Sequence, residues 1–224
     1  MKTYRKAIGI VILGGALFIA GRVSTSFDGV AAAAQDDRPR TTQPPRDEAQ
    51  DPMDEMMQDP EMQAWMAAGQ PGEHHKHLDA FVGEWEGTVK IWEGPGAEPM
   101  ESSGRISREW TLDNHFIHET VEAETPFGPL KGISFMGYNN VTGQYESTWF
   151  ENFSTGTYRE TGSYDTARKV FTFIGQHPEP GGAITTSWSE VDVSDPSRQT
   201  MKSWSFDENG AKFLVFEGVF EKVN

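Results

Sequence analysis

From Glu84 onward, hydrophobic and polar residues alternate with a period of two, which is typical of β-strands that bury one face. Clusters of Gly, Pro, Asn and Asp divide this region into short segments, and no long helical pattern interrupts them. We expect ten strands, centred near Val89, Ser107, Thr120, Phe135, Thr148, Arg159, Thr172, Ser187, Ser203 and Phe216. Many short strands at regular spacing favour a barrel or a sandwich, and closure into a barrel removes exposed sheet edges. We therefore predict an all-β fold, an antiparallel up-and-down barrel of about ten strands over residues 83–224.

The hairpin at residues 105–122 has the best-specified register. Asp113-Asn114 is a two-residue turn signal, so the cross-strand pairs follow by counting outward from it. The expected pairs are Arg105–Glu122, Ile106–Val121, Arg108–Glu119, Glu109–His118, Trp110–Ile117 and Leu112–His115. A shift of one residue would break all of them at once. Arg108 and Glu119 share the apolar face, which predicts an opposite-charge pair inside the barrel.

The last hairpin turns at Asn209-Gly210, another strong turn signal. Counting outward from this turn predicts the pairs Phe206–Phe213, Trp204–Val215 and Lys202–Glu217. Lys202 and Glu217 then form a second opposite-charge pair on a largely apolar face. The opposite face of this hairpin is also apolar, so its orientation is less strongly specified than that of the first.

Residues 1–34 have the order of a secretory signal. Lys2, Arg5 and Lys6 precede an uncharged run over residues 7–21, and small residues follow, with cleavage expected after Ala34. The run is shorter than the roughly 20 residues that span a bilayer. Because residues 22–30 separate it from the alanines, an uncleaved N-terminal anchor is the alternative. We expect an exported protein, periplasmic or extracellular, with no other membrane association.

Two further segments precede the barrel. Residues 35–59 are rich in Pro, Asp, Glu and Gln, which predicts a disordered acidic linker. Residues 60–82 predict two short helices that pack on the barrel. The first is capped by Asp59 and ends near Gly69, and the second begins near residue 75. Met62, Trp65 and Met66 share one face of the first helix, which suits packing on its own domain or a partner protein.

Composition limits the partners and the sources of stability. The chain has 34 acidic and 19 basic residues, a formal net charge of −15, so it repels phosphate backbones and anionic lipid. Nucleic-acid binding is therefore not expected. The sequence has no cysteine, which rules out disulfides and thiolate metal sites. Stability must come from a packed core, for which 7 Trp, 5 Tyr and 14 Phe provide large side chains.

Four motifs together resemble the bacterial domain-of-unknown-function family 1579. They are EHHKHLDAFVGEW at residues 73–85, GAEPMESSG at 96–104, GYNNVT at 137–142 and STW at 147–149. The resemblance covers about residues 60–222. It implies a calycin-like β-barrel, the group of lipocalins, fatty-acid-binding proteins and nitrobindin-like haem proteins. It also implies an interior cavity, but no known activity or catalytic residue.

The resemblance suggests two comparisons within the calycin group. Gly83-x-Trp85 is similar to the motif that opens the first strand of lipocalins, in which the Trp closes the barrel floor beneath an Arg from a late strand. This chain has no Arg after Arg198, so Lys202 or Lys222 would have to replace it. Nitrobindin-like proteins hold haem through a His near the end of the barrel. Residues 212–224 contain no His, and the last one, His177, falls in a Pro-rich loop, so we expect no cofactor.

The sequence carries no motif for metal binding or hydrolysis. His74, His75 and His77 lie close together, but their spacing places no third or fourth ligand, so a solvated helix start is expected and no metal site. The chain has no Gly-x-Ser-x-Gly elbow, no phosphate-binding glycine loop and no HExxH. We assign no catalytic residue.

Three functions fit these patterns. The first is a lipocalin-like binding protein that holds a small, partly apolar ligand in a cavity above roughly 300 Å³. The second is an isomerase or hydrolase on the same barrel, with His115 or Glu119 as base. The third is a structural or envelope interaction protein with a filled barrel. Under the first, the expected ligand-binding residues are Arg108, Trp110, His115, Glu119, Trp149, Trp188, Lys202 and Trp204.

Overall fold

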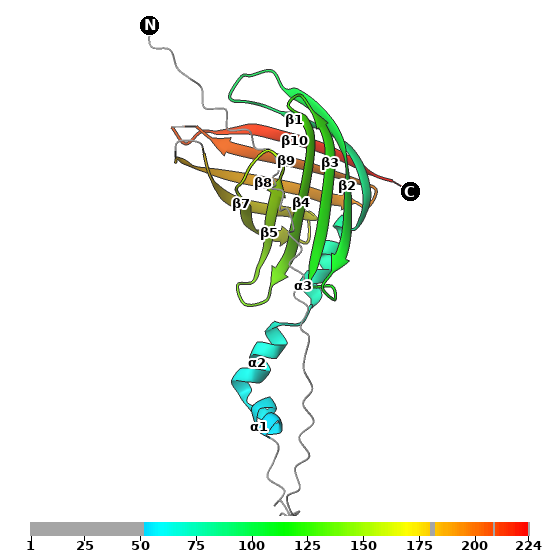
Figure 1. Ribbon diagram of the computed structural model, residues 1–224, viewed down its shortest axis with the longest axis vertical. Coiled ribbons are helices and arrows are strands. Elements are labelled where there is room, and N and C mark those ends of the chain that lie inside the picture. Colours follow the sequence, from blue (N-terminus) through cyan, green and yellow to red (C-terminus); the bar gives the residue numbers. More distant parts are fainter. Residues whose placement is uncertain (1–51, 180–181, 208, 224) are drawn as a thin grey trace, which may run out of the picture. The chain divides into compact units, whose positions relative to one another are not determined.

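The computed structural model describes residues 52–179, 182–207 and 209–223. From Gln70 onward the chain forms a closed barrel of ten antiparallel strands (Figure 1). The strands are β1 (Gly83–Ile91), β2 (Met100–Thr111), β3 (Phe116–Thr125), β4 (Gly128–Asn139), β5 (Gln144–Glu151), β6 (Tyr158–Asp165), β7 (Val170–Pro178), β8 (Ile184–Asp195), β9 (Arg198–Phe206) and β10 (Lys212–Lys222). Each strand pairs with its neighbours in the sequence, and β10 pairs with β1 to close the wall. The predicted all-β barrel is confirmed, and each predicted strand centre lies within one of the ten strands.

The first predicted hairpin register is confirmed. In the β2–β3 ladder, Arg108 pairs with Glu119 and Trp110 with Ile117, as counting from the turn requires. His115 N donates to Leu112 O at 3.2 Å. Asp113 and Asn114 both have positive φ, 55° and 64°, as a tight hairpin turn of this length needs.

In the last hairpin, the structure differs from two of the three predicted pairs. Leu214 pairs with Trp204 and Phe213 with Ser205, so the predicted pairs Trp204–Val215 and Phe206–Phe213 are wrong. A β-bulge between Leu214 and Phe216 inserts an extra residue into β10. That residue restores the count, so Glu217 does pair with Lys202 as predicted.

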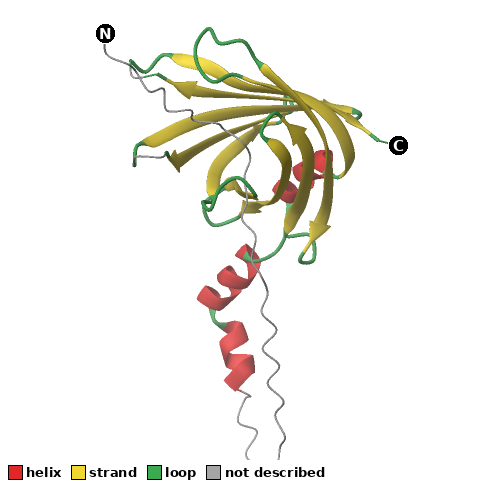
Figure 2. Cartoon of the chain, turned by 45° about the horizontal axis from the view of Figure 1, so that its top comes forward, coloured by secondary structure: helices red, strands yellow, loops and turns green. Residues whose placement is uncertain are grey.

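Two short helical segments lie at one end of the barrel (Figure 2). Their apolar side chains pack into this end and close it. They are α3 (Glu73–Lys76) and the 3₁₀ turn η1 (His77–Phe81), which match the expected second helix. Leu78 and Phe81 are buried and pack with the inward side chains Ile117, Met136, Tyr145 and Phe171. We call this end, where the helical segments lie, the closed end.

Trp85 forms the floor beside η1. Its side chain is fully buried, and its Nε1 donates to Phe81 O at 2.8 Å. Lys222 Nζ lies 5.3 Å from the centroid of the Trp85 ring, so of the two candidate lysines it is Lys222 that lies over this tryptophan, while Lys202 binds Glu217. Gly83 has φ +129°, and a Cβ there would lie 2.6 Å from Lys222 Cε, so glycine suits both the backbone and the close approach.

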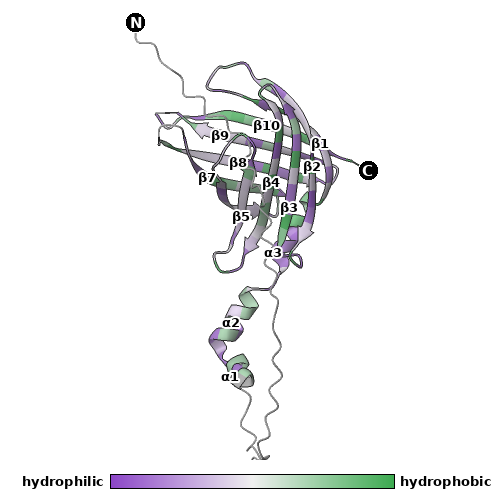
Figure 3. Cartoon of the chain, in the orientation of Figure 1, coloured by the Kyte–Doolittle hydropathy of each residue, from purple (hydrophilic) through white to green (hydrophobic). Residues whose placement is uncertain are grey.

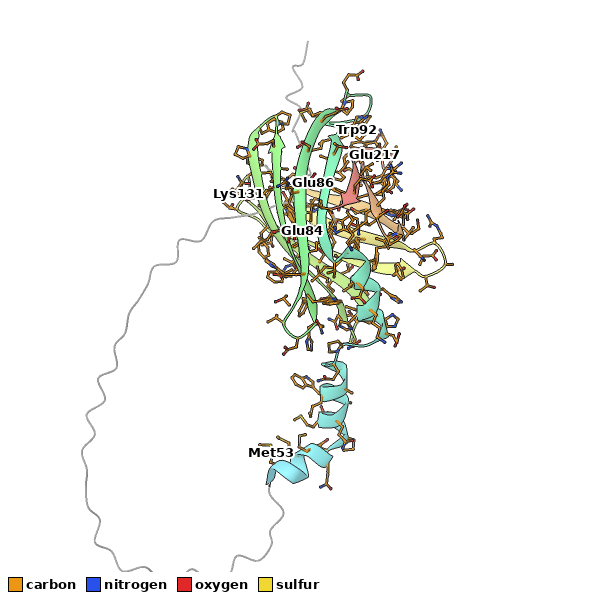
Figure 4. The ribbon with its side chains drawn as sticks, turned by 90° about the vertical axis from the view of Figure 1, so that its right-hand side faces the viewer. Met53, Glu84, Glu86, Trp92, Lys131 and Glu217 are labelled. Atoms are coloured by element: carbon orange, nitrogen blue, oxygen red, sulfur yellow. The ribbon has the colours of Figure 1, made fainter. Side chains whose placement is uncertain are left out.

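Alternation along the strands separates the core from the outer face (Figure 3). A second core cluster brings Trp85, Ile91 and Ile106 against the β10 side chains Val215, Phe216 and Phe220. Charged pairs bridge neighbouring strands on the outside. Among them are Glu86–Arg105 at 2.8 Å and Arg198–Glu221 at 3.1 Å (Figure 4, with Glu86 labelled).

The helices α1 (Pro52–Gln58) and α2 (Pro60–Ala68) belong to a separate unit that ends at Gly69. α2 begins and ends as predicted, since Asp59 Oδ1 accepts from Glu61 N at 2.7 Å and Gly69 caps the other end. Residues 52–58 of the predicted disordered linker form the helix α1, so the prediction is wrong for this stretch. The methionines of this stretch make it less polar than the rest of the predicted linker. No side chain of α2 is buried, and packing of its Met62, Trp65 and Met66 face on the domain stays a prediction.

The predicted secretory signal and most of the predicted linker lie outside the described residues. Export and cleavage therefore stay predictions. In the described part of the chain, we find no helix whose length and apolar character would let it cross a membrane.

Candidate functional site

The barrel encloses a cavity of about 140 Å³ with a mostly apolar lining. The lining extends from Phe81 at the closed end to Pro126 and Phe127 in the β3–β4 loop. Its apolar walls include Val89, Ile106, Val121, Leu130, Met136, Trp149, Phe173, Val191, Met201, Phe216 and Phe220. The predicted volume above roughly 300 Å³ is too large, because aromatic and Met side chains from many strands reach into the interior.

Arg108 and Glu119 line this cavity as a close ion pair. Arg108 Nε donates to Glu119 Oε2 at 2.5 Å, and both side chains are only 10% exposed. Removing two charges from water costs several kcal/mol for each ion, so a buried pair needs good geometry and further hydrogen bonds. The prediction that this pair faces inward is confirmed.

Gln199 supplies those further hydrogen bonds. Arg108 Nη1 donates to Gln199 Oε1 at 2.9 Å, and Gln199 Nε2 donates to Ala80 O at 2.7 Å. The guanidinium also lies over the Phe81 ring, with Cζ 5.4 Å from its centroid. The network therefore ties β2, β3 and β9 to η1. Sequence reasoning missed Gln199, although the inward period of β9 (199, 201, 203, 205) would have found it.

Glu160 is a second cavity-lining carboxyl that sequence reasoning missed. It lies on β6 between Ser147 of β5 and Gly175 of β7, and Ser187 Oγ donates to its Oε1 at 3.1 Å. Burial raises the pKa of the Glu160 carboxyl, and the Ser187 hydrogen bond opposes this only in part. The side chain forms no ion pair within the described residues, in contrast to Glu119.

A third polar group lies toward the other end of β5 and β7. Glu151 and His177 are each 3% exposed, and Glu151 Oε2 and both His177 ring nitrogens have no hydrogen-bond partner among the described residues. The Tyr158 ring on the intervening strand lies 5.0 Å from the His177 ring, edge to face. Burial raises the pKa of Glu151 to about 8 and lowers the pKa of His177. His177 was expected in a loop, but β7 continues to Pro178 and buries it.

The remaining predicted site residues divide between the cavity, the closed end and the outer face. Trp149 lines the cavity, beside Ser134 and Ser147. Trp110 Nε1 donates to Asp79 Oδ1 at 2.8 Å, and His115 Nδ1 lies 2.6 Å from Leu112 O in the β2–β3 turn. Neither Trp110 nor His115 lines the cavity.

Trp188, Lys202 and Trp204 lie on the outer face. Odd-numbered residues of β8 and β9 are the buried ones, so even-numbered residues point outward. Trp188 pairs with Trp204 across the strands, and Lys212 Nζ lies 4.2 and 3.8 Å from their ring centroids. Lys202 Nζ binds Glu217 Oε1 at 2.9 Å, partly exposed to solvent. The expectation that these three residues contribute to the pocket is therefore corrected by the strand register.

The three neighbouring histidines do not converge on a common point. His75 Nδ1 accepts from Gly72 N at 3.0 Å, His77 Nδ1 lies 2.7 Å from Tyr145 Oη, and the His74 ring stacks on Tyr138. These contacts fasten α3 and η1 to the strands. Over the described residues, no three His, Asp or Glu side chains are arranged to hold a metal ion.

Solved structures share this fold. The chain is similar to Rv2717c from M. tuberculosis, with 13% identity and a TM-score of 0.51 over 69% of this chain and 100% of that chain. It also matches the S-type phycobiliprotein lyase CPES from Guillardia theta, with 9% identity and a TM-score of 0.48 over 71% of this chain and 97% of that chain. The likeness to Rv2717c shows a shared fold and nothing about function.

Sequence comparisons place the chain in a family. No functionally curated protein matches it. The model of the family described as "Protein of unknown function (DUF1579)" matches residues 70–222, which include α3, η1 and all ten strands of the barrel. The chain belongs to the DUF1579 family.

Proposed function

We propose that this protein binds a small, partly apolar molecule inside its barrel. The observation that carries the proposal is the cavity of about 140 Å³, whose walls are mostly apolar and which holds the Arg108–Glu119 pair. Concave, mainly apolar sites with a few polar groups are the usual form of small-molecule sites.

The volume limits the size of the ligand. An apolar cavity of roughly 150 Å³ holds a molecule such as benzene. Without side-chain movement, the ligand is therefore compact, with a single ring or a short chain. Phe127, half-exposed in the β3–β4 loop, lies in the lining, where its displacement would enlarge the space.

An enzyme that uses His115 or Glu119 as base receives less support from the geometry. His115 lies in a turn away from the cavity lining, and Glu119 is held by Arg108 at 2.5 Å. A general base must reach the substrate proton within hydrogen-bond distance. A filled structural barrel is also less well supported, because the interior retains the cavity.

Native mass spectrometry of protein purified from its own host tests the proposal. We expect a bound small molecule that is released on denaturation. A cavity-filling variant, Val121→Phe, should lose it, because Val121 lines the cavity. Thr120→Phe, at the adjacent outward-facing position, is the matched control and should retain it. The proposal fails if the wild-type protein carries no ligand and binds none of a set of small apolar compounds.

A further inference from the structure

The carboxyl groups of the cavity differ in how they are paired. Arg108 and Glu119 neutralise each other, and the exposed Glu101 pairs with Lys90 at 3.6 Å. Glu160 also lines the cavity. Within the described residues, its carboxyl group accepts a hydrogen bond from the neutral hydroxyl of Ser187. The cavity therefore contains a carboxyl group without a compensating cation.

Small residues surround this carboxyl and give it room. Its cross-strand neighbours are Ser147 and Gly175. A Cβ at Gly175 would lie 2.7 Å from Glu160 Cγ and 3.2 Å from Oε1, so a larger residue there would push the side chain away. Ser187 donates to Oε1, and the other carboxyl oxygen forms no hydrogen bond with the described residues.

The neutral form of this carboxyl suits the site. Burial without a cation disfavours the carboxylate, and the pKa of Glu160 is accordingly raised. A neutral carboxyl donates one hydrogen bond, whereas a carboxylate only accepts. An anionic ligand would have to compete with Glu119 for Arg108 and would lie in the same small cavity as Glu160.

We propose that Glu160 determines ligand specificity and that the ligand is a compact, uncharged molecule with a hydrogen-bond acceptor such as a carbonyl, not a carboxylate. This inference rests on the proposed function, because it requires the ligand to occupy the cavity. It adds the chemical class of the ligand and the residue that selects it.

Three probes that share a six-membered ring and differ in chemistry test the inference. Cyclohexanone has an acceptor, methylenecyclohexane has the same shape without one, and cyclohexanecarboxylate is an anion. Affinities are measured by NMR titration of the full chain. We expect the ketone to bind about tenfold more tightly than the alkene, the effect of one hydrogen bond. The carboxylate should bind most weakly.

Variants assign the effect to Glu160. Glu160→Leu should remove the advantage of the ketone over the alkene, whereas Glu160→Gln, which keeps a donor, should retain most of it. Glu122→Gln, on the exposed outer face of β3, is the control and should leave all three affinities unchanged. If Glu160→Leu fails to fold, the inference is judged from the wild-type protein alone, by whether the ketone binds more tightly than the alkene and the carboxylate.

The outcomes separate this inference from the proposed function. Equal binding of ketone and alkene, or tightest binding of the carboxylate, overturns the inference and leaves cavity binding intact. A ketone advantage that survives in Glu160→Leu also overturns it. If none of the probes binds but native mass spectrometry finds a bound ligand, the inference fails and cavity binding stands; if neither measurement shows binding, both proposals fail.

Discussion

Individual acidic residues in this barrel have very different surroundings. Glu119 is held by a guanidinium, Glu160 by a serine hydroxyl, and Glu151 Oε2 has no partner among the described residues. The sequence shows three glutamates on strands, but their protonation depends on neighbours that are distant in the chain. Of these three glutamates, only Glu119 was assigned its partner from the sequence, because Arg108 and Glu119 belong to one hairpin.

The ion pair at Arg108 should be important for stability. Arg108→Met leaves Glu119 buried without its cation, which is expected to reduce the free energy of unfolding by about 3–5 kcal/mol. Arg105→Met, on the exposed face of the same strand, should reduce it by less than about 1 kcal/mol. Urea denaturation measures both. Equal losses in the two variants would show that the inner pair is not effectively buried.

Glu151 should make stability depend on pH. Its folded pKa of about 8 lies above the ordinary value of 4.5, so between these values the folded state binds the proton and the unfolded state releases it. Stability from this group is complete below pH 4.5 and decreases as pH rises toward 8, by up to about 1.4 kcal/mol per pH unit. Glu151→Gln removes this contribution. Denaturation of both proteins from pH 5 to 8 measures the difference, and parallel stability curves would contradict the prediction.

At the scale of elements, local turn chemistry predicted register well where no irregularity followed. Asp113-Asn114 gave every pair of the β2–β3 hairpin. Counting from Asn209-Gly210 was one residue out because Asp207 N donates to Ala211 O at the turn, and the bulge in β10 restored the predicted register at Lys202–Glu217. A bulge moves side chains to the other face and depends on packing across the barrel. Trp188 and Trp204 were misplaced for a related reason, since apolar residues occupy both faces of their strands and composition does not distinguish inside from outside.

The junction of η1 and β1 offers a test at this scale. Gly83→Ala would place a Cβ at φ +129° and against Lys222, which lies over Trp85. We expect a loss of about 1–3 kcal/mol in the free energy of unfolding from backbone strain. Gly94→Ala, where a Cβ meets nothing within 4 Å, is the control and should have little effect. Thermal denaturation compares them, and a Gly83→Ala protein as stable as the control would show that this position is not constrained.

For the molecule as a whole, strand number, closure and the helical cover of one end were predictable from periodicity, turns and the family resemblance. The set of residues that meet in the interior was not predictable in this way. Gln199 and Glu160 acquire their roles because closure brings β6 and β9 around one space with β2 and β3, and a linear pattern does not show which inward residues meet across it. The same closure sets the cavity at about 140 Å³, smaller than the roughly 300 Å³ expected of a small-molecule site.

A crystal structure determined under xenon pressure tests the central claim most directly, because xenon enters dry apolar cavities of this size. The account predicts a xenon atom inside the barrel, in contact with Val121, Trp149 and Phe216. An interior filled by side chains, with no xenon among these three residues, would contradict it.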